Sequence, residues 1–373
     1  MPAISTEDLN ALENPGINSF EHISVSSKPY EWGLGSTKRT AMIRENLYSK
    51  AVVVKDWAEV LSGIGKTSFR KNVKLDVDRA RLVTESYKET QGMPIVIRKA
   101  MVMKKLCEEI PIFIEPGQLL VGDPNSAPNE IRWFPEIASE HMLESIQPSG
   151  GYGHMVTNEE REEILEICNY WKDKCQEAAV KSAIPEDVLP YLERSLQNPC
   201  FYANHWACGR NIIGFDYELL FEEGLNNRLK RVESKLAELT KKIVDGMQDM
   251  GNEAYLEKKR NWEAQIICGK AIIRFAQRYA ELALEQEKAE TDGVRKAELK
   301  EIARICTKVP ANPPETFYEA LQFQWIIEIV GRYLHGPNNG SGPGSPRAKF
   351  APRWKAGWES RITRDEAKEL LEC

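Results

Sequence analysis

Apolar residues recur every three or four positions along much of the chain, which is the spacing of a helix with one buried face. In one region this spacing is unbroken, at Leu225, Leu229, Val232, Leu236, Leu239 and Ile243. The pattern predicts a long amphipathic helix there, ended by Gly246 and Gly251, and two more over about 254–286 and 292–306. These glycine breaks favour an antiparallel helical layer over a coiled coil.

Helical spacing also extends to shorter segments, which are 40–62, 77–91, 95–107 behind Pro94, and 186–196. Thr157-Asn158-Glu159-Glu160 is a capping box, in which the Thr and Glu side chains satisfy the first turn of a helix. That helix is predicted to carry one apolar face, made of Ile164, Ile167, Cys168, Trp171 and Cys175. Pro314 starts a further helix with the apolar face Phe317, Leu321 and Trp325, and Thr363-Arg364-Asp365-Glu366 caps the last one.

The breaks between these segments divide the chain. Residues 1–40 lack a clear period and are expected to form an irregular arm, with one domain over 41–373. A Pro116-Gly117 turn separates two apolar runs at 110–122. Residues 124–155 are predicted to be a long connection that includes Arg132-Trp133-Phe134, and such connections are often functional.

The stretch from Cys208 to Tyr217 has a different pattern. Ile212 and Ile213 are strand-like, and Gly209 and Gly214 allow the backbone to turn or to approach another surface. Arg210 precedes the apolar pair, and its guanidinium matches a carboxylate in two parallel hydrogen bonds. The alternative is a surface arginine before a short strand.

The composition and charge of the chain argue against some classes of partner. A chain of 373 residues with 42% hydrophobic residues forms a real core, and its net charge of −6 gives no reason to expect nucleic acid as a partner. No apolar run is long enough to span a bilayer, and no secretion signal is visible at the start. No membrane partner is therefore expected, and the cytoplasm is the expected location.

The eight cysteines show no metal-ligand or redox spacing. In a reducing compartment they are predicted to be free thiols, most of them buried. Cys168 and Cys175 lie seven residues apart, so a single helix would place them on one face. No bound metal is expected.

Four segments resemble the N-terminal part of the glycyl radical enzymes, the family that includes pyruvate formate-lyase. They are Arg98-Lys99-Ala100 with Ile114–Gly122, Gly209–Tyr217 with Glu223-Gly224-Leu225, Pro314–Gln322, and Arg361–Cys373. Gln118 stands where the family usually has Glu, and residues 336–349 depart from the usual Gly-Arg-aromatic segment.

The resemblance implies the fold class α/β, with residues 41–373 as the N-terminal portion of a ten-stranded α/β barrel rich in outer helices. It implies that the catalytic Cys loop and the radical Gly lie beyond residue 373, so that no catalytic residue is expected here and the chain alone is expected to be inactive. It further implies no directly bound cofactor, a glycyl radical installed by a separate S-adenosylmethionine/iron–sulfur activating enzyme, a homodimer, and an anaerobic cytoplasm.

For the substrate, the resemblance implies a carboxylate held by Arg210, since relatives that bind carboxylates place Arg there. His205, Trp206 and Phe134 are candidate residues of an aromatic pocket, with ordinary barrel core as the alternative. Arylacetate decarboxylation is the first expectation. The alternatives are hydrocarbon–fumarate addition, a keto-acid formate-lyase, and a lyase or dehydratase that cleaves a C–X bond. A helical scaffold subunit is the non-enzyme alternative, and it predicts a reading frame that ends near residue 373.

Overall fold

The structure is a computed structural model. It describes residue 39, residues 74–128, 130–137, 139, 156–188, 215–246 and 251–334, and residues 362, 363, 366, 367, 369 and 370. The predicted helix over 40–62, the strand-like pair at 212–213 and the loop at 336–349 lie outside these residues, as does most of the predicted helix over 186–196.

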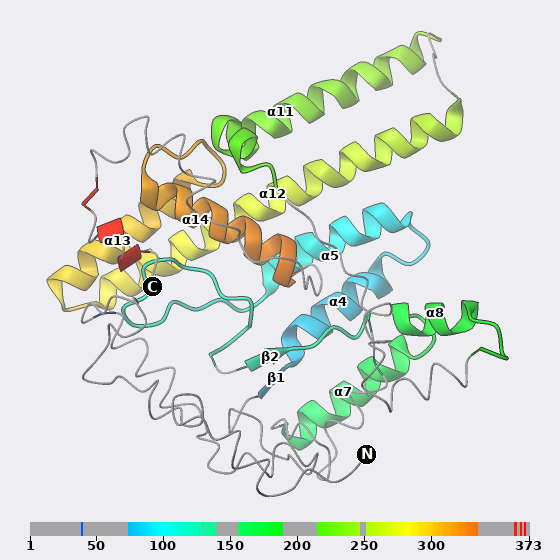
Figure 1. Ribbon diagram of the computed structural model, residues 1–373, viewed down its shortest axis with the longest axis horizontal. Coiled ribbons are helices and arrows are strands. Elements are labelled where there is room, and N and C mark those ends of the chain that lie inside the picture. Colours follow the sequence, from blue (N-terminus) through cyan, green and yellow to red (C-terminus); the bar gives the residue numbers. More distant parts are fainter. Residues whose placement is uncertain are drawn as a thin grey trace, which may run out of the picture.

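Helices dominate the described part (Figure 1). In chain order they are α4 (Val77–Glu89), α5 (Ile95–Glu109), α7 (Asn158–Trp171), α8 (Gln176–Ala183), α11 (Tyr217–Val244), α12 (Asn252–Ala289), α13 (Gly293–Lys308) and α14 (Phe317–Glu328), which continues into the π-helical η2 (Ile329–Leu334). The predictions for 77–91, 95–107, 254–286 and 292–306 are confirmed, and so is the long amphipathic helix before Gly246. Residues 366, 367, 369 and 370 are helical as well.

Side-chain caps explain where several of these helices begin. An N-cap oxygen accepts a hydrogen bond from a backbone N–H that has no partner within the helix. Asp76, Thr157, Asp216, Asp292 and Thr316 all do this. Both halves of the predicted capping box at Thr157 are present. The corresponding pair at Thr363 and Glu366 also forms, with reciprocal bonds of 2.8 and 3.2 Å.

One prediction about the cysteines is wrong. Cys168 and Cys175 do not share a helix, because α7 ends at Trp171. Cys175 is instead the N-cap of α8, and its sulfur lies 3.5 Å from the Ala178 nitrogen. Both cysteines are nevertheless buried. The segment was therefore correctly predicted to be apolar, but it was wrongly predicted to be one continuous helix.

Two short strands pair in parallel, β1 (Lys74–Asp76) with β2 (Glu130–Arg132). The register places Leu75 opposite Ile131 and Asp76 opposite Arg132. β2 lies inside the segment that was predicted to be a connection throughout, so that prediction was incomplete. The pair lies beside α4, at one end of the helical layer (Figure 1).

α11 and α12 run antiparallel and side by side, as the glycine breaks predicted (Figure 1). Gly269 of α12 lets Leu229 of α11 approach closely, because a Cβ at position 269 would lie 2.7 Å from a Leu229 methyl carbon. Gly224 interrupts α11 with φ +64°, and a Cβ there would lie 2.7 Å from the Asn312 backbone. A left-handed backbone in so close a contact requires glycine.

α14 is buried on all sides, although the sequence predicted a single apolar face. Phe317 and Leu321 are buried as expected, but so are polar residues on its other faces: Glu319, Gln322, Gln324 and Glu328. The helix lies across the layer (Figure 1), and its residues contribute to both hydrophobic clusters found among the described residues. Each buried polar side chain on it therefore requires a partner, and these partners define much of the local structure.

Candidate functional site

The carboxyl ends of the two parallel strands are the first place to seek a site, because open α/β sheets bind ligands beyond these ends. β1 ends at Asp76 and β2 at Arg132, and Trp133 and Phe134 follow directly. Leu75 belongs to the hydrophobic cluster shared with the helices. Since side chains alternate along a strand, Asp76, Glu130 and Arg132 belong to the opposite face, away from that cluster.

Asp76, the last residue of β1, has a buried carboxylate. Its Oδ1 accepts hydrogen bonds from the Arg79 nitrogen at 3.1 Å and from the Ser126 hydroxyl at 2.8 Å. Its Oδ2 accepts from the Ser126 nitrogen at 3.1 Å. Burial raises the pKa of Asp76, and these hydrogen bonds oppose that shift. The carboxylate therefore joins the first turn of α4 to the connection that leads into β2.

Phe134, the one predicted substrate residue within the described part, is held by Arg79. The Arg79 guanidinium lies 4.0 Å from the centre of the Phe134 ring. It also donates to the Trp133 carbonyl at 3.0 Å and to Glu136 at 2.6 Å. Arg79 is fully buried and Phe134 is half-buried. One face of the ring is thus fixed against a buried cation. The other predicted substrate residues, Arg210, His205 and Trp206, lie outside the described residues.

Asp123 lies in the segment that approaches β2. Burial raises the pKa of Asp123, while the hydrogen bond from the Asn125 nitrogen at 2.8 Å and the nearby Arg132 charge oppose that rise. Its backbone N–H donates to the hydroxyl of Tyr279, a fully buried residue of α12. The strand ends therefore combine charged side chains with a half-buried aromatic ring, a combination suited to a small polar molecule.

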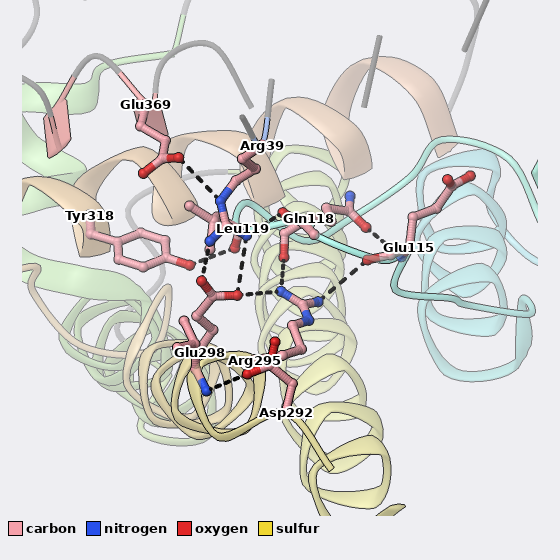
Figure 2. Close-up of polar contacts among 11 residues, drawn as sticks. Arg39, Glu115, Gln118, Leu119, Asp292, Arg295, Glu298, Tyr318 and Glu369 are labelled. Carbon is pink, nitrogen blue, oxygen red and sulfur yellow. Dashed lines mark hydrogen bonds and ion pairs between the residues drawn. The ribbon is translucent and has the colours of Figure 1, made fainter. Parts of the chain in front are cut away.

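The Pro116-Gly117 turn is held by a polar cluster, which we call the turn clamp: Arg39, Arg295, Glu298, Tyr318 and Glu369 (Figure 2). Arg39 donates to the Gly117 carbonyl at 2.8 Å and Arg295 to the Gln118 carbonyl at 2.9 Å. Tyr318 donates to the Leu119 carbonyl at 2.6 Å. The turn clamp contains two guanidinium and two carboxylate groups. Their charges balance, so the clamp provides no excess charge for an ionic ligand.

α14 also holds the extended segment after this turn. The Gln322 side-chain amide accepts from the Val121 nitrogen at 2.9 Å and donates to the Val121 oxygen at 2.7 Å. Trp325 donates to the Gly122 carbonyl at 3.0 Å. Together with Tyr318, these side chains provide the hydrogen bonds that a neighbouring strand would otherwise supply. This arrangement leads the chain toward Asp123 and β2.

The described thiols are mostly buried. Cys107, Cys168, Cys175 and Cys306 are buried, Cys268 is half-buried, and none of the five forms a disulfide. Burial raises the pKa of Cys168 and of Cys268 to about 11, and that of Cys306 to about 12. A thiol needs a lowered pKa and access to react as a thiolate. For these five cysteines, the prediction of free and mostly buried thiols is confirmed.

Neither a metal centre nor a membrane span emerges from the described part of the chain. Its His, Cys, Asp and Glu residues form no group of three or more that could hold a metal ion. Among the described helices, none combines the length and apolar character needed to cross a membrane.

The pyruvate formate lyase-like family model matches residues 37–373, nearly the whole chain. The chain belongs to this family. Membership agrees with the resemblance to glycyl radical enzymes seen in the Ile114–Gly122 and Pro314–Gln322 segments. In the structure these two segments lie against each other, because Tyr318 and Gln322 bond to the backbone of Leu119 and Val121.

Curated relatives within the family include lyases and dehydratases. The isethionate sulfite-lyase of Oleidesulfovibrio alaskensis is 32% identical over 312 residues, which are 81% of this chain and 37% of that enzyme. The trans-4-hydroxy-L-proline dehydratase of Clostridioides difficile is 30% identical over 304 residues, 80% of this chain and 37% of that enzyme. This family member thus spans little more than a third of either relative. An indoleacetate decarboxylase of Tractidigestivibacter scatoligenes is more distant, at 23% over 294 residues.

The fold prediction is confirmed by a solved structure. A protein studied for 1,2-propanediol dehydration in Roseburia inulinivorans aligns with a TM-score of 0.73 and 26% identity. The alignment covers 91% of this chain and 37% of that one. The chain therefore has the fold of part of a glycyl radical enzyme, a family of α/β barrels.

Proposed function

We propose that the enzyme containing this chain is a glycyl radical lyase that cleaves a carbon–heteroatom bond in a small substrate that carries an acid group. The observation that carries this proposal is the identity of 32% and 30% to a sulfite-lyase and a dehydratase. One acts on a sulfonate and the other on an amino acid, so both substrates carry an acidic group. Arylacetate decarboxylation becomes the second candidate, because the indoleacetate decarboxylase match is weaker, at 23%.

In this proposal Arg210 binds the acid group of the substrate. A guanidinium fork forms paired hydrogen bonds to a carboxylate or to two oxygens of a sulfonate. His205 and Trp206 lie close to Arg210 in sequence and are proposed to line the same pocket. Phe134 is proposed to supply an apolar wall, since Arg79 fixes its ring at the carboxyl end of β2.

Radical chemistry, when the glycyl radical is present, supplies abstraction of a hydrogen atom from the bound substrate. Of the described residues, Phe134 is proposed to contribute to substrate orientation, and none of the five described cysteines, four buried and one half-buried, is proposed as the partner thiol. We place residues 41–373 as the N-terminal part of the barrel domain, in a dimeric cytoplasmic enzyme of an anaerobic cell. A separate activating enzyme would install the radical.

The test is substrate binding and turnover by the Arg210→Lys variant of the intact enzyme. Loss of a paired charge-assisted contact should lower kcat/KM by about a hundredfold, while the radical signal in electron paramagnetic resonance stays at the wild-type level. Arg260→Lys, at an exposed position of α12, is the matched control. Isethionate, trans-4-hydroxy-L-proline and phenylacetate distinguish the two candidate reactions. Unchanged kinetics would remove Arg210 from the site, and turnover of phenylacetate alone would favour decarboxylation.

A further inference from the structure

The turn clamp joins parts of the chain that are far apart in sequence (Figure 2). Arg39 donates to the Gly117 carbonyl at 2.8 Å, to Glu298 of α13 at 3.1 Å and to Glu369 at 3.3 Å. The positions that it connects are 78, 259 and 330 residues away along the chain. One side chain therefore contacts the turn, a central helix and the C-terminal helical residues.

Apolar packing at the same place connects two of these partners. Ala367 and Leu370 flank Glu369 in sequence, and both are buried. They belong to one hydrophobic cluster with Leu119, which directly follows the clamped turn. Displacement of the C-terminal helical residues would therefore disturb the turn through packing as well as through Arg39.

Two other members of the turn clamp, Arg295 and Tyr318, also bind the turn segment. Arg295 holds the Gln118 carbonyl and Tyr318 holds the Leu119 carbonyl. Arg39 alone among the clamp members bonds to both the turn and Glu369. Its side chain and those of Glu298 and Glu369 retain 17–28% of their exposure, so water and salt reach the ion pairs.

We propose that Arg39 is a latch that makes the order of the Pro116-Gly117 turn depend on docking of the C-terminal helical residues. With Arg39 engaged, both are held to Glu298 on α13. Without it, Arg295 and Tyr318 keep the turn folded, but the turn and the C-terminal residues open more often and do so together. A partner or a change elsewhere in the enzyme that withdraws Arg39 would loosen both segments at once.

Hydrogen–deuterium exchange of the intact protein, followed by mass spectrometry, tests the latch. Arg39→Met should speed exchange about tenfold in peptides covering 112–122 and 362–372, and leave peptides from the middle of α12 unchanged. Arg39→Lys should give a smaller effect in the same two peptides, because an ammonium cannot satisfy three separated acceptors as a guanidinium does. Arg260→Met, on the exposed face of α12, should change neither peptide.

Glu369→Gln provides a second perturbation that does not touch Arg39 itself. If the latch exists, the double variant Arg39→Met/Glu369→Gln exchanges no faster than Arg39→Met alone, because both substitutions break the same link. Additive effects would refute the coupling. So would faster exchange in only one of the two peptides, or a uniform increase across all peptides, which would indicate general destabilisation.

Discussion

Gln322→Met tests whether a side chain of α14 substitutes for a neighbouring strand. Gln322 is 1% exposed, and its amide makes both a donor and an acceptor contact with Val121. Methionine has a similar length and no comparable hydrogen-bonding group. The substitution therefore leaves the N–H and the C=O of Val121 without these partners, in a residue with no exposed surface.

The structure sets the size of the effect. A buried polar group that loses its partner costs about 1–3 kcal/mol, and two such groups are involved. The apolar methionine side chain recovers part of this through burial. We expect the free energy of unfolding to fall by about 3 kcal/mol, a large part of the roughly 5–15 kcal/mol typical of a folded domain. Tyr318 and Trp325 still hold Leu119 and Gly122, so the segment should loosen around Val121 first.

Urea denaturation followed by circular dichroism measures this change, and hydrogen exchange of the peptide over 118–124 locates it. Gln277→Met is the matched control, because Gln277 is an exposed glutamine of α12. Its substitution should alter stability by no more than about 0.5 kcal/mol. If Gln322→Met behaves like this control, the Val121 backbone has access to water and the reasoning about α14 is wrong.

Two further predictions concern buried polar groups. The pKa of Glu319 is lowered because, although burial opposes ionisation, hydrogen bonds from the two cations of α13 and from a backbone N–H outweigh it. Its stabilisation should be complete above the ordinary pKa of 4.5 and be lost as pH falls through the lowered pKa. Glu319→Gln should therefore cost about 2 kcal/mol at pH 7 and progressively less as pH falls below 4.5 in urea titrations. Trp171→Phe should cost at least about 1 kcal/mol more than Trp133→Phe, because the Trp171 indole donates to Thr84 at 2.8 Å, whereas the buried Trp133 indole N–H has no acceptor among the described residues. Equal losses by thermal melting would contradict this.

The long helices could be predicted because their signal is local. Apolar spacing between 225 and 306, together with glycines at the breaks, located three helices and their antiparallel arrangement. The end of α7 had no such signal. Apolar residues continue at helical spacing to Cys175, but the helix stops at Trp171, and a cysteine takes a capping role that Ser, Thr, Asp or Asn usually fills.

β2 escaped prediction for a different reason. It is three residues long, and charged Glu130 and Arg132 flank a single apolar residue. A buried parallel strand usually has a continuous apolar run. Its partner β1 ends 54 residues earlier, counted from Asp76 to Glu130. No local sequence pattern therefore indicates that the two strands pair. Only the tertiary arrangement shows that this segment is a strand.

Part of the candidate site was proposed from the sequence. Phe134 was selected for its aromatic neighbours, but its fixation by Arg79 depends on two residues that are 55 positions apart. Asp76 had a detectable signal, since an aspartate directly before a helical run is a common N-cap. The local structure accounts for Gln118, which stands where the family usually has Glu. Its Oε1 accepts from the Glu115 nitrogen at 3.0 Å, a bond that a carboxylate oxygen would also form.

Three buried polar side chains of the described chain share one property that bears on function. Gln322 satisfies a backbone segment, Asp76 satisfies the first turn of α4 and Ser126, and Arg79 is shared among Trp133, Phe134 and Glu136. Groups that are already bonded in this way orient neighbouring residues, and they are poorly placed to exchange protons with a substrate. Substitutions among them should therefore change stability and KM before they change the rate of bond cleavage. An equal loss of kcat at constant KM and stability would instead assign one of them to the chemical step.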